Sequence, residues 1–340
     1  MTDLLVAGGG PAGLASALHA VRAGLDVVVW EPRGAVIDKA CGEGLMPGAV
    51  SALRRLGVDP SGHELTGIRY VGDGATAEAA FADGPGRGVR RTTLHAALRG
   101  AVLEAGVEIV RRPVTRVEHL DGHVVVDGTK VGYLVAADGL HSPTRRLLGL
   151  DGRPSRVRRY GLRAHLPMSP WTSLVEVHWS STAEAYVTPV GDGLVGVALL
   201  TTLRRPFAEQ LGDFPALAER IEGRTVGPVR GAGPLRQRSR RRVGGRALLV
   251  GDASGYVDAL TGEGISLALA QARAAIDAVV ADDPERYEAE WRRITLRYRA
   301  LTAGLLGVSR VAPLRLRLVP VAAAMPGVFR AGVNALARPV

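Results

Sequence analysis

The chain has 340 residues, 46% of them hydrophobic, and a formal net charge of +10. This length allows a sizeable core and two lobes, and the apolar content excludes a disordered protein. The single cysteine, Cys41, excludes an internal disulfide and a cysteine-cluster metal site, so we expect no metal. Nearly all of the basic charge is arginine with little aromatic interleaving, which favours a solvated surface over a nucleic-acid interface.

The first 31 residues predict a βαβ unit. Asp3 to Ala7 is a buried strand, Pro11 to Ala23 a helix that ends at Gly24, and Asp26 to Trp30 a second strand. Because this apolar run starts at Asp3, we expect no signal peptide and a cytoplasmic protein.

The turn of this unit carries the glycine pattern of a dinucleotide site. Gly8 allows a tight turn, Gly10 lets the backbone approach a pyrophosphate, and Gly13 lets helix and strand pack closely. The helix N-terminus would then face the phosphates. Glu31 stands 18 residues after Gly13, near the position of an acid that meets ribose hydroxyls.

The next segments continue the α/β pattern up to Gly149. Residues 38–48 are glycine-rich and irregular, and hairpins are expected at 68–81 and 114–126. A helix is expected at 92–105, with strands at 107–110 and 133–137. Four strands at short spacing follow, at 160–166, 174–179, 184–189 and 194–200, and indicate an antiparallel lobe.

The α/β pattern returns at Arg246, with a helix expected from Ile265 to Val280 and further helices after Tyr287. We therefore expect an α/β protein with a Rossmann-like, glutathione-reductase-like domain formed by residues 1–62, 87–150 and 245–285. An antiparallel β-sheet substrate domain would comprise residues 63–86 and 151–244. Residues 286–340 would form C-terminal helices.

Three further motifs accompany the glycine pattern. They are Arg91 at a helix start, the segment Asp138-Gly139, and Gly251-Asp252-Ala253 followed by Gly262-Glu263-Gly264. In this order and spacing the chain resembles FAD-dependent monooxygenases of the aromatic-hydroxylase (p-hydroxybenzoate hydroxylase-like) superfamily. The resemblance covers residues 1 to about 280. A strand would bring the carboxylate of Asp252 to the ribityl hydroxyls, and the following helix would point its positive end at the flavin.

The resemblance implies a set of FAD-binding residues on both sides of the cofactor. They are Gly8, Gly10, Pro11, Ala12, Gly13, Glu31, Pro32, Arg33, Cys41, Gly42, Arg91, Asp138, Gly251, Asp252, Gly262, Gly264 and Ile265. Cys41 is expected to be a small packing residue rather than a redox thiol.

Two segments are similar to the geranylgeranyl reductase-like branch of this superfamily: residues 39–45, Lys-Ala-Cys-Gly-Glu-Gly-Leu, and residues 260–264, Leu-Thr-Gly-Glu-Gly. The aromatic strand of that branch corresponds here to residues 185–189, where Tyr186 replaces Trp and Thr188 replaces Phe. Tyr186 and Pro189 are expected to face the substrate. His165 and His178 on neighbouring strands are candidate acids or bases.

The resemblance implies a monooxygenase that uses NADPH or NADH as a transient reductant and O2 to hydroxylate a lipophilic aromatic, phenolic or polyketide-type molecule of secondary metabolism. The alternative is a flavoenzyme that reduces C=C bonds of isoprenoid or related compounds. A non-catalytic flavin- or lipid-binding protein is the third interpretation. The protein would be a monomer or homodimer.

Two arginine-rich regions leave alternatives open. Arginines between 236 and 246 could attract an acidic substrate or NADPH phosphates, although a solvated strand edge is favoured. The C-terminal region mixes apolar residues with arginines and is compatible with peripheral contact with an anionic membrane or with packing on the core. Its uncharged run from Leu318 to Phe329 is shorter than the ~20 residues that span a bilayer.

Overall fold

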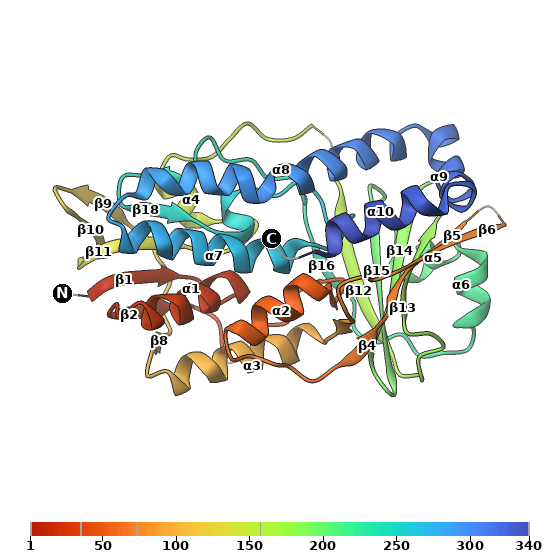
Figure 1. Cartoon of the computed structure of the whole chain (residues 1–340), viewed down its shortest axis with the longest axis horizontal. Helices are drawn as coiled ribbons and strands as arrows, with labels where there is room; N and C mark the ends of the chain where they lie inside the picture. The colour runs from red at the N-terminus through yellow and green to blue at the C-terminus, as the bar shows by residue number, and fades with distance from the viewer. Residues whose placement is uncertain (1, 35, 73, 157, 339–340) are drawn as a thin grey trace.

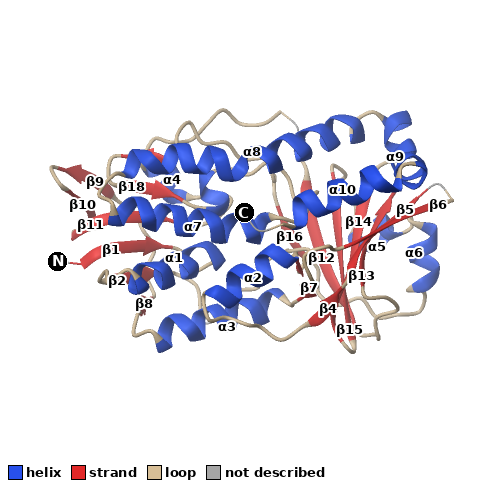
Figure 2. Cartoon of the chain, in the orientation of Figure 1, coloured by secondary structure: helices blue, strands red, loops and turns tan. Residues whose placement is uncertain are grey.

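The structure is a computed structural model, and it describes residues 2–34, 36–72, 74–156 and 158–338. Two sheets lie side by side along the long axis, with helices over one side of the first sheet and long C-terminal helices crossing to the second (Figure 1). Figure 2 shows the same arrangement by element type. Residues 339 and 340 of the expected helical C-terminus lie outside the described residues.

The first sheet is mainly parallel. It contains both the strand that precedes the glycine turn and the strand that precedes Gly251 and Asp252. Its order is β17 (Val243–Gly244), β18 (Ala247–Leu249), β11 (Thr129–Ala136), β1 (Thr2–Ala7), β2 (Val27–Trp30) and β8 (Glu108–Val110). The hairpin β9 (Val117–Leu120) and β10 (His123–Val126) is attached to β11. β11 pairs in parallel with both β1 and β18. The carboxyl ends of β1 and β18 therefore lie at the same edge of the sheet, although they are about 240 residues apart in the sequence.

Helices cover the face of this sheet to which Leu4 and Val6 point. They are α1 (Pro11–Arg22), α2 (Pro47–Arg55), α3 (Arg91–Glu104) and α7 (Gly264–Val280). Leu5 and Ala7 alternate to the other face, where they pack with Trp30 and the valines of β10. A strand buried on both faces is what the continuous apolar run at 3–7 predicts. The short helix α4 (Pro143–Leu147) and the 3-10 turn η1 (Gly251–Ser254) follow β11 and β18.

The second sheet has the order β16 (Arg230–Ala232), β12 (Tyr160–Leu166), β15 (Leu194–Thr201), β14 (Ala183–Gly191), β13 (Leu174–Trp179), β5 (Gly67–Gly72) and β6 (Ala75–Ala80). All four expected strands between residues 160 and 200 are present. These four strands pair antiparallel as expected, and β13 also pairs with β5 in parallel. The strands β13 and β5 are more than 100 residues apart, so no hairpin dictates their direction.

A third, smaller sheet and two short helices accompany the two large sheets. A three-stranded sheet of β3 (Gly44–Leu45), β7 (Gly86–Gly88) and β4 (His63–Leu65) lies in the connecting segments. Within the expected irregular stretch 38–48, β3 and the first turn of α2 are therefore ordered elements. The helices α5 (Phe207–Leu211) and α6 (Pro215–Arg220) pack on the outer face of the second sheet.

The C-terminal helices are α8 (Pro284–Ser309), α9 (Ala312–Ala324) and α10 (Pro326–Ala337). A buried ion pair fixes the start of α8 to the first sheet. Glu288 accepts hydrogen bonds from the backbone N–H of Arg242 at 2.8 Å and from its guanidinium, which also lies 4.1 Å over the Trp291 ring. Burial opposes the charge, but the bonds from Arg242 hold the pKa of Glu288 below its ordinary value.

Replacing Glu288 by Gln should lower the free energy of unfolding by about 3 kcal/mol at pH 7, because Arg242 is left buried without its counter-charge. A lowered carboxyl pKa stabilises the fold above the ordinary pKa and loses this effect as pH falls, so the difference from wild type should shrink in acid. Urea unfolding of both proteins at several pH values measures this difference in the free energy of unfolding. The control E290Q removes an exposed pair with Arg293 on the same helix and should cost less than about 1 kcal/mol. Equal effects of the two variants would contradict the assignment.

Candidate functional site

The glycine pattern forms a close-packed turn between β1 and α1. A Cβ on Gly13 would lie 1.9 Å from the Gly8 carbonyl oxygen, and one on Gly8 would lie 2.6 Å from the Ala137 oxygen. A Cβ on Gly10 would meet nothing within 4 Å. Pro11 begins α1, and no side chain caps the helix there. Gly8 and Gly13 are thus needed for the fold, whereas Gly10 leaves open space before uncapped N–H groups, as a phosphate site requires.

Glu31 lies where an adenosine ribose is expected. Its Oε2 accepts a hydrogen bond from Gly9 N at 2.8 Å, and its Oε1 accepts one from Arg33 Nε at 2.8 Å. Although burial opposes it, these bonds hold the pKa of Glu31 below its ordinary value. A cavity of about 130 Å³ is lined here by Glu31, Arg33, His95, Arg99 and Ile109, among others. Pro32 lies in the same turn after β2.

Asp252 marks the opposite end of the site. It follows β18 in η1, and burial raises the pKa of its carboxyl while the cations Lys39 and Arg91 oppose that shift. Arg91 opens α3 and is buried, and burial lowers its pKa. Asp138 follows β11, where its Oδ2 accepts from Thr144 N at 2.8 Å. The three motifs separated in sequence therefore meet in space.

Lys39 lies between these two ends, and sequence reasoning did not assign it a role. Burial, followed by the positive charge of Arg33, lowers the pKa of its ammonium. Its charge interacts with both Glu31 and Asp252. We call the glycine turn together with Lys39, Arg91, Asp138 and Asp252 the flavin site.

The flavin site fits FAD. Among the described residues, the buried atoms Arg91 Nη1 and Asp138 Oδ1 have no hydrogen-bond partner. Buried polar groups of this kind need partners, and a pyrophosphate and a polyhydroxyl chain supply an acceptor and donors, respectively. Arg33, Lys39 and Arg91 would balance the two phosphate charges, and Asp252 would accept from ribityl hydroxyls.

The loop of Cys41, Gly42 and Glu43 connects the flavin site to the second sheet. Burial raises the pKa of the Cys41 thiol, which agrees with packing rather than redox chemistry. Glu43 is buried with a φ of 60°, a strained conformation for a residue with a Cβ. Its Oε1 accepts from Arg91 N at 2.8 Å, and its Oε2 lies 2.6 Å from His165 Nε2.

One face of the second sheet meets this loop. The register places His165, Gly196 and Thr188 in one row across three strands, and Arg163, Ala198 and Tyr186 in the next. Thr188 donates to the Gly42 carbonyl at 2.8 Å, and Tyr186 donates to the Leu260 carbonyl at 2.7 Å. We call these two rows the flavin-side face. They bring the candidates His165 and Tyr186 together beside the cofactor-binding loops.

Two other sequence candidates lie on the opposite face. His178 is paired with Ala185, and Pro189 with Val195, and both partners belong to the core beneath α5 and α6. The His178 imidazole contacts Glu176 at 3.2 Å. Since side chains alternate along a strand, the expectation that His178 and Pro189 face the same substrate as Tyr186 is not met by this structure.

Gly262 lies in the turn before α7, and the helix begins with Gly264 and Ile265. Gly262 has a φ of +72°, and a Cβ on it would approach Met46 to 3.1 Å. Between the glycines, burial raises the pKa of Glu263 to about 8, so this side chain is mostly neutral at pH 7. A neutral Glu263 leaves the positive end of α7 uncompensated, which suits an electron-rich flavin edge.

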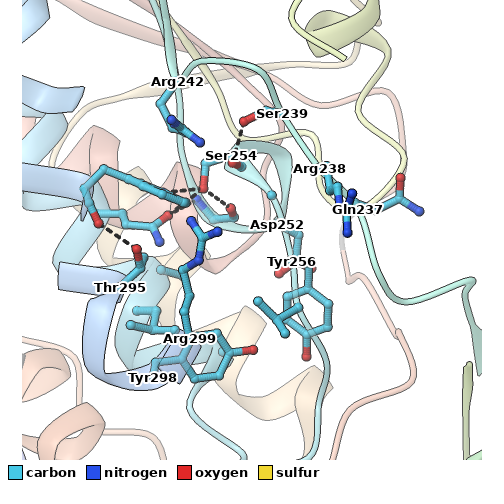
Figure 3. Close-up of a pocket in the computed structure, with 18 of the residues that line it drawn as sticks. Gln237, Arg238, Ser239, Arg242, Asp252, Ser254, Tyr256, Thr295, Tyr298 and Arg299 are labelled. Carbon is cyan, nitrogen blue, oxygen red and sulfur yellow. Dashed lines mark hydrogen bonds between the residues drawn. The ribbon is translucent and has the colours of Figure 1, made fainter. Parts of the chain in front are cut away.

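A second cavity, of about 240 Å³, lies between the segment before β17, η1 and the helices α7 and α8 (Figure 3). Its lining includes Asp252 and Gly264, so it adjoins the flavin site. Arg236, Arg238 and Arg299 also line it, and none of them pairs with a carboxylate of the described residues. The expected solvated edge at 236–246 is thus divided: Arg241, Arg242 and Arg246 bind acidic residues, whereas Arg236 and Arg238 face a cavity.

Several site residues were missed in the sequence. The sequence did mark Lys39 as unusual, because it is one of only two lysines in the chain. Glu43 stands within the quoted motif at 39–45, but only the fold reveals its partners. Gly196 had no signal: a Cβ there would lie 3.0 Å from Glu43 Oε2, so glycine makes room for the contact with His165.

Substituting Gly10 by Ala should leave the melting temperature of the cofactor-free protein nearly unchanged and weaken FAD binding at least tenfold, because only a bound phosphate would meet the added methyl. Quenching of FAD fluorescence gives the Kd. The control G100A lies in α3 with equally open surroundings and should bind FAD normally. Normal FAD affinity of G10A would place the pyrophosphate elsewhere.

Comparison with known proteins agrees with this geometry. Residues 1–202 match the model of a family described as FAD binding domain. Menaquinone reductase of Mycolicibacterium smegmatis is 32% identical over 324 residues, covering 85% of this chain and 79% of the relative. Digeranylgeranylglycerophospholipid reductase 1 of Methanopyrus kandleri is 28% identical over 327 residues and covers 85% of each chain.

Solved structures show the same fold. The flavin-dependent halogenase CmlS aligns with a TM-score of 0.80 at 19% identity, over 100% of this chain and 68% of that one. A geranylgeranyl bacteriochlorophyll reductase-like protein of Thermoplasma acidophilum aligns with a TM-score of 0.77 at 17% identity, over 98% and 95%. With the family match and the reductase relatives, the chain belongs to the FAD binding domain family and is a FAD-dependent oxidoreductase.

Proposed function

We propose that the protein reduces carbon–carbon double bonds in the isoprenoid chain of a lipid. The observation that carries this proposal is the similarity over 85% of the chain to relatives named as reductases of menaquinone and of digeranylgeranylglycerophospholipid. Both names denote lipids with isoprenoid chains. The sequence motifs favoured a monooxygenase over a C=C reductase. The names of these relatives favour the reductase over the monooxygenase.

The reaction needs a hydride and a proton. When bound, FAD supplies hydride transfer, from a nicotinamide reductant to one carbon of the double bond. The second carbon takes a proton, which the protein or solvent must provide. On the flavin-side face, His165 is the best candidate for that proton.

The hydrogen bonds of His165 show which ring nitrogen carries the hydrogen. Arg163 Nη1 lies 3.2 Å from His165 Nδ1, and because a guanidinium only donates, Nδ1 accepts. Nε2 therefore carries a hydrogen and donates it to Glu43 at 2.6 Å. Glu43 and Arg163 thus fix one tautomer and hold a proton beside the loop of Cys41 and Gly42.

One side of Tyr186 is apolar, which suits an isoprenoid chain, and the charged groups of Arg159, Glu184 and Asp258 also lie near it. Val177, Trp179, Leu200 and Leu260 pack with it in one cluster. The same surroundings suit an aromatic substrate, so hydroxylation through O2 stays the second candidate. The two reactions differ in their need for oxygen.

Anaerobic turnover is the test of the proposed function. FAD-loaded protein is incubated without O2 with NADPH deuterated at C4 and with detergent-dispersed menaquinone or digeranylgeranyl phospholipid. We expect a lipid with one deuteride and one solvent proton per reduced double bond, detected by mass spectrometry. Product only in the presence of O2 would support the monooxygenase instead. Flavin binding with neither product would indicate a non-catalytic protein.

We also propose that the arginine-lined cavity takes the phosphates of the nicotinamide reductant. Arg299 of α8 lies in this cavity with Tyr298 beside it (Figure 3), and its guanidinium lies 5.1 Å from the centroid of the Trp291 ring. Arginines without carboxylate partners are suited to phosphate, which they bind in bidentate fashion. The 2′-phosphate of NADPH adds two negative charges that NADH lacks.

Replacing Arg299 by Ala should raise the KM for NADPH at least tenfold with a much smaller effect on that for NADH, because one phosphate contact is lost. Steady-state rates of flavin reduction with both nucleotides give these constants. The control R293A removes an exposed arginine of the same helix and should leave both constants unchanged. A KM that rises equally for both nucleotides would contradict a 2′-phosphate site.

A further inference from the structure

The last 50 residues of the chain differ in charge from the rest. From Trp291 to Val340 the sequence contains nine arginines and no aspartate, glutamate or lysine. The rest of the chain is nearly balanced, since the nine arginines account for most of the net charge of +10. Four of the nine pair with carboxylates, and the other five, which have no such partner among the described residues, are Arg297, Arg299, Arg310, Arg317 and Arg330.

The same helices expose most of the large apolar side chains on the surface. Of the fifteen large hydrophobic residues that are exposed in the described chain, nine lie between residues 296 and 328. They are Leu296, Leu301, Val308, Val311, Leu314, Leu316, Val321, Met325 and Val328. Scattered apolar residues are normal on a surface, but this concentration marks an interaction site.

The exposed residues are densest where α9 and α10 meet. The uncharged run from Leu318 to Phe329 contains this bend, with Arg317 before it and Arg330 after it, both exposed. At the bend Val321 is 53% exposed, Met325 50% and Val328 63%. We call this segment the C-terminal elbow. No single described helix is long and apolar enough to cross a bilayer, although α9 and α10, bent by 102°, meet the length and composition test as a pair.

The elbow is anchored by its inner side. Arg315 donates to the Ser180 carbonyl at 2.7 Å and lies 2.7 Å from the buried Glu184. Asn334 of α10 accepts from Ala82 N at 2.7 Å, and Phe329 packs on Tyr70 with 4.8 Å between ring centroids. The elbow is therefore held on β5 and β6, at the end of the molecule farthest from the N-terminus (Figure 1), with its apolar tip outward.

We propose that the C-terminal elbow docks the protein on the surface of an anionic lipid bilayer. The tip, Val321 to Val328, would enter the interface, and the flanking arginines would contact lipid phosphates. Charge selects this occupant: Arg310, Arg317 and Arg330 are exposed around the elbow and pair with no carboxylate of the described residues, so they complement an anionic bilayer, whereas a second copy of the same surface would be repelled. The inference concerns binding, so it stands apart from the proposed reduction of an isoprenoid lipid, although it would bring the site to such a substrate.

Vesicle flotation with FAD-loaded, full-length protein tests the proposal. We expect binding to phosphatidylcholine vesicles that contain phosphatidylglycerol, weak binding to phosphatidylcholine alone, and loss of binding at high salt. The variant M325D/V328D should reduce partitioning at least tenfold while the melting temperature stays unchanged, because both side chains are exposed. R317E/R330E should remove the preference for the anionic lipid.

The control L103D places a charge on an exposed apolar residue of α3 and should bind vesicles like wild type. Equal binding of M325D/V328D and wild type, or no binding at all, would overturn the proposal. A dimer in light scattering that the same variant abolishes would assign the surface to self-association instead. The vesicles contain no isoprenoid substrate, so failure of the reductase assay leaves this result unaffected.

Discussion

The carboxylate of Glu43 holds the site together. One of its oxygens accepts from the backbone of Arg91 at the start of α3, and the other meets His165 on the second sheet. Glu43 adopts a left-handed conformation to reach both, a strain that the surrounding contacts must offset. Through this one side chain, the cofactor-binding helix, the glycine-rich loop and the flavin-side face keep a fixed relation.

Close backbone approach at this junction depends on glycines. A Cβ on Gly88 would lie 1.6 Å from the Pro189 carbonyl oxygen, and one on Gly196 would approach Glu43. Thr188 adds a hydrogen bond to Gly42 from the same side. The second sheet is thus positioned by contacts along the edge of the flavin site, and His165 receives its tautomer from groups contributed by both lobes.

The charge arrangement follows from the same geometry. Arg33, Lys39 and Arg91 are gathered in a partly buried space with Glu31 and Asp252 at its two ends. Burial disfavours these charges, as the lowered pKa of Lys39 and the raised pKa of Asp252 show. A dianionic pyrophosphate with a hydroxylated chain would relieve both effects, so cofactor binding and stability are coupled here.

Local patterns predicted much of the fold, because apolar runs and glycine turns are determined by neighbouring residues. The βαβ unit, the four strands between 160 and 200 and the helix after Gly264 could all be read in this way. The parallel pairing of β13 with β5 could not, since it joins segments more than 100 residues apart. The face of the second sheet on which His178 and Pro189 lie depends on strand register, because a shift by one residue moves a side chain to the opposite face. The partners of Glu43 and Lys39 are equally non-local.

A crystal structure of the FAD-loaded protein tests the central claim most directly. The account predicts that the pyrophosphate lies over Gly10 at the start of α1, that Arg91 Nη1 and Asp138 Oδ1 bind the cofactor, and that Asp252 accepts from the ribityl chain. The pair of Glu43 and His165 should persist beside the flavin. A cofactor that leaves Arg91 and Asp138 without partners, or a flavin ring remote from His165, would contradict the account.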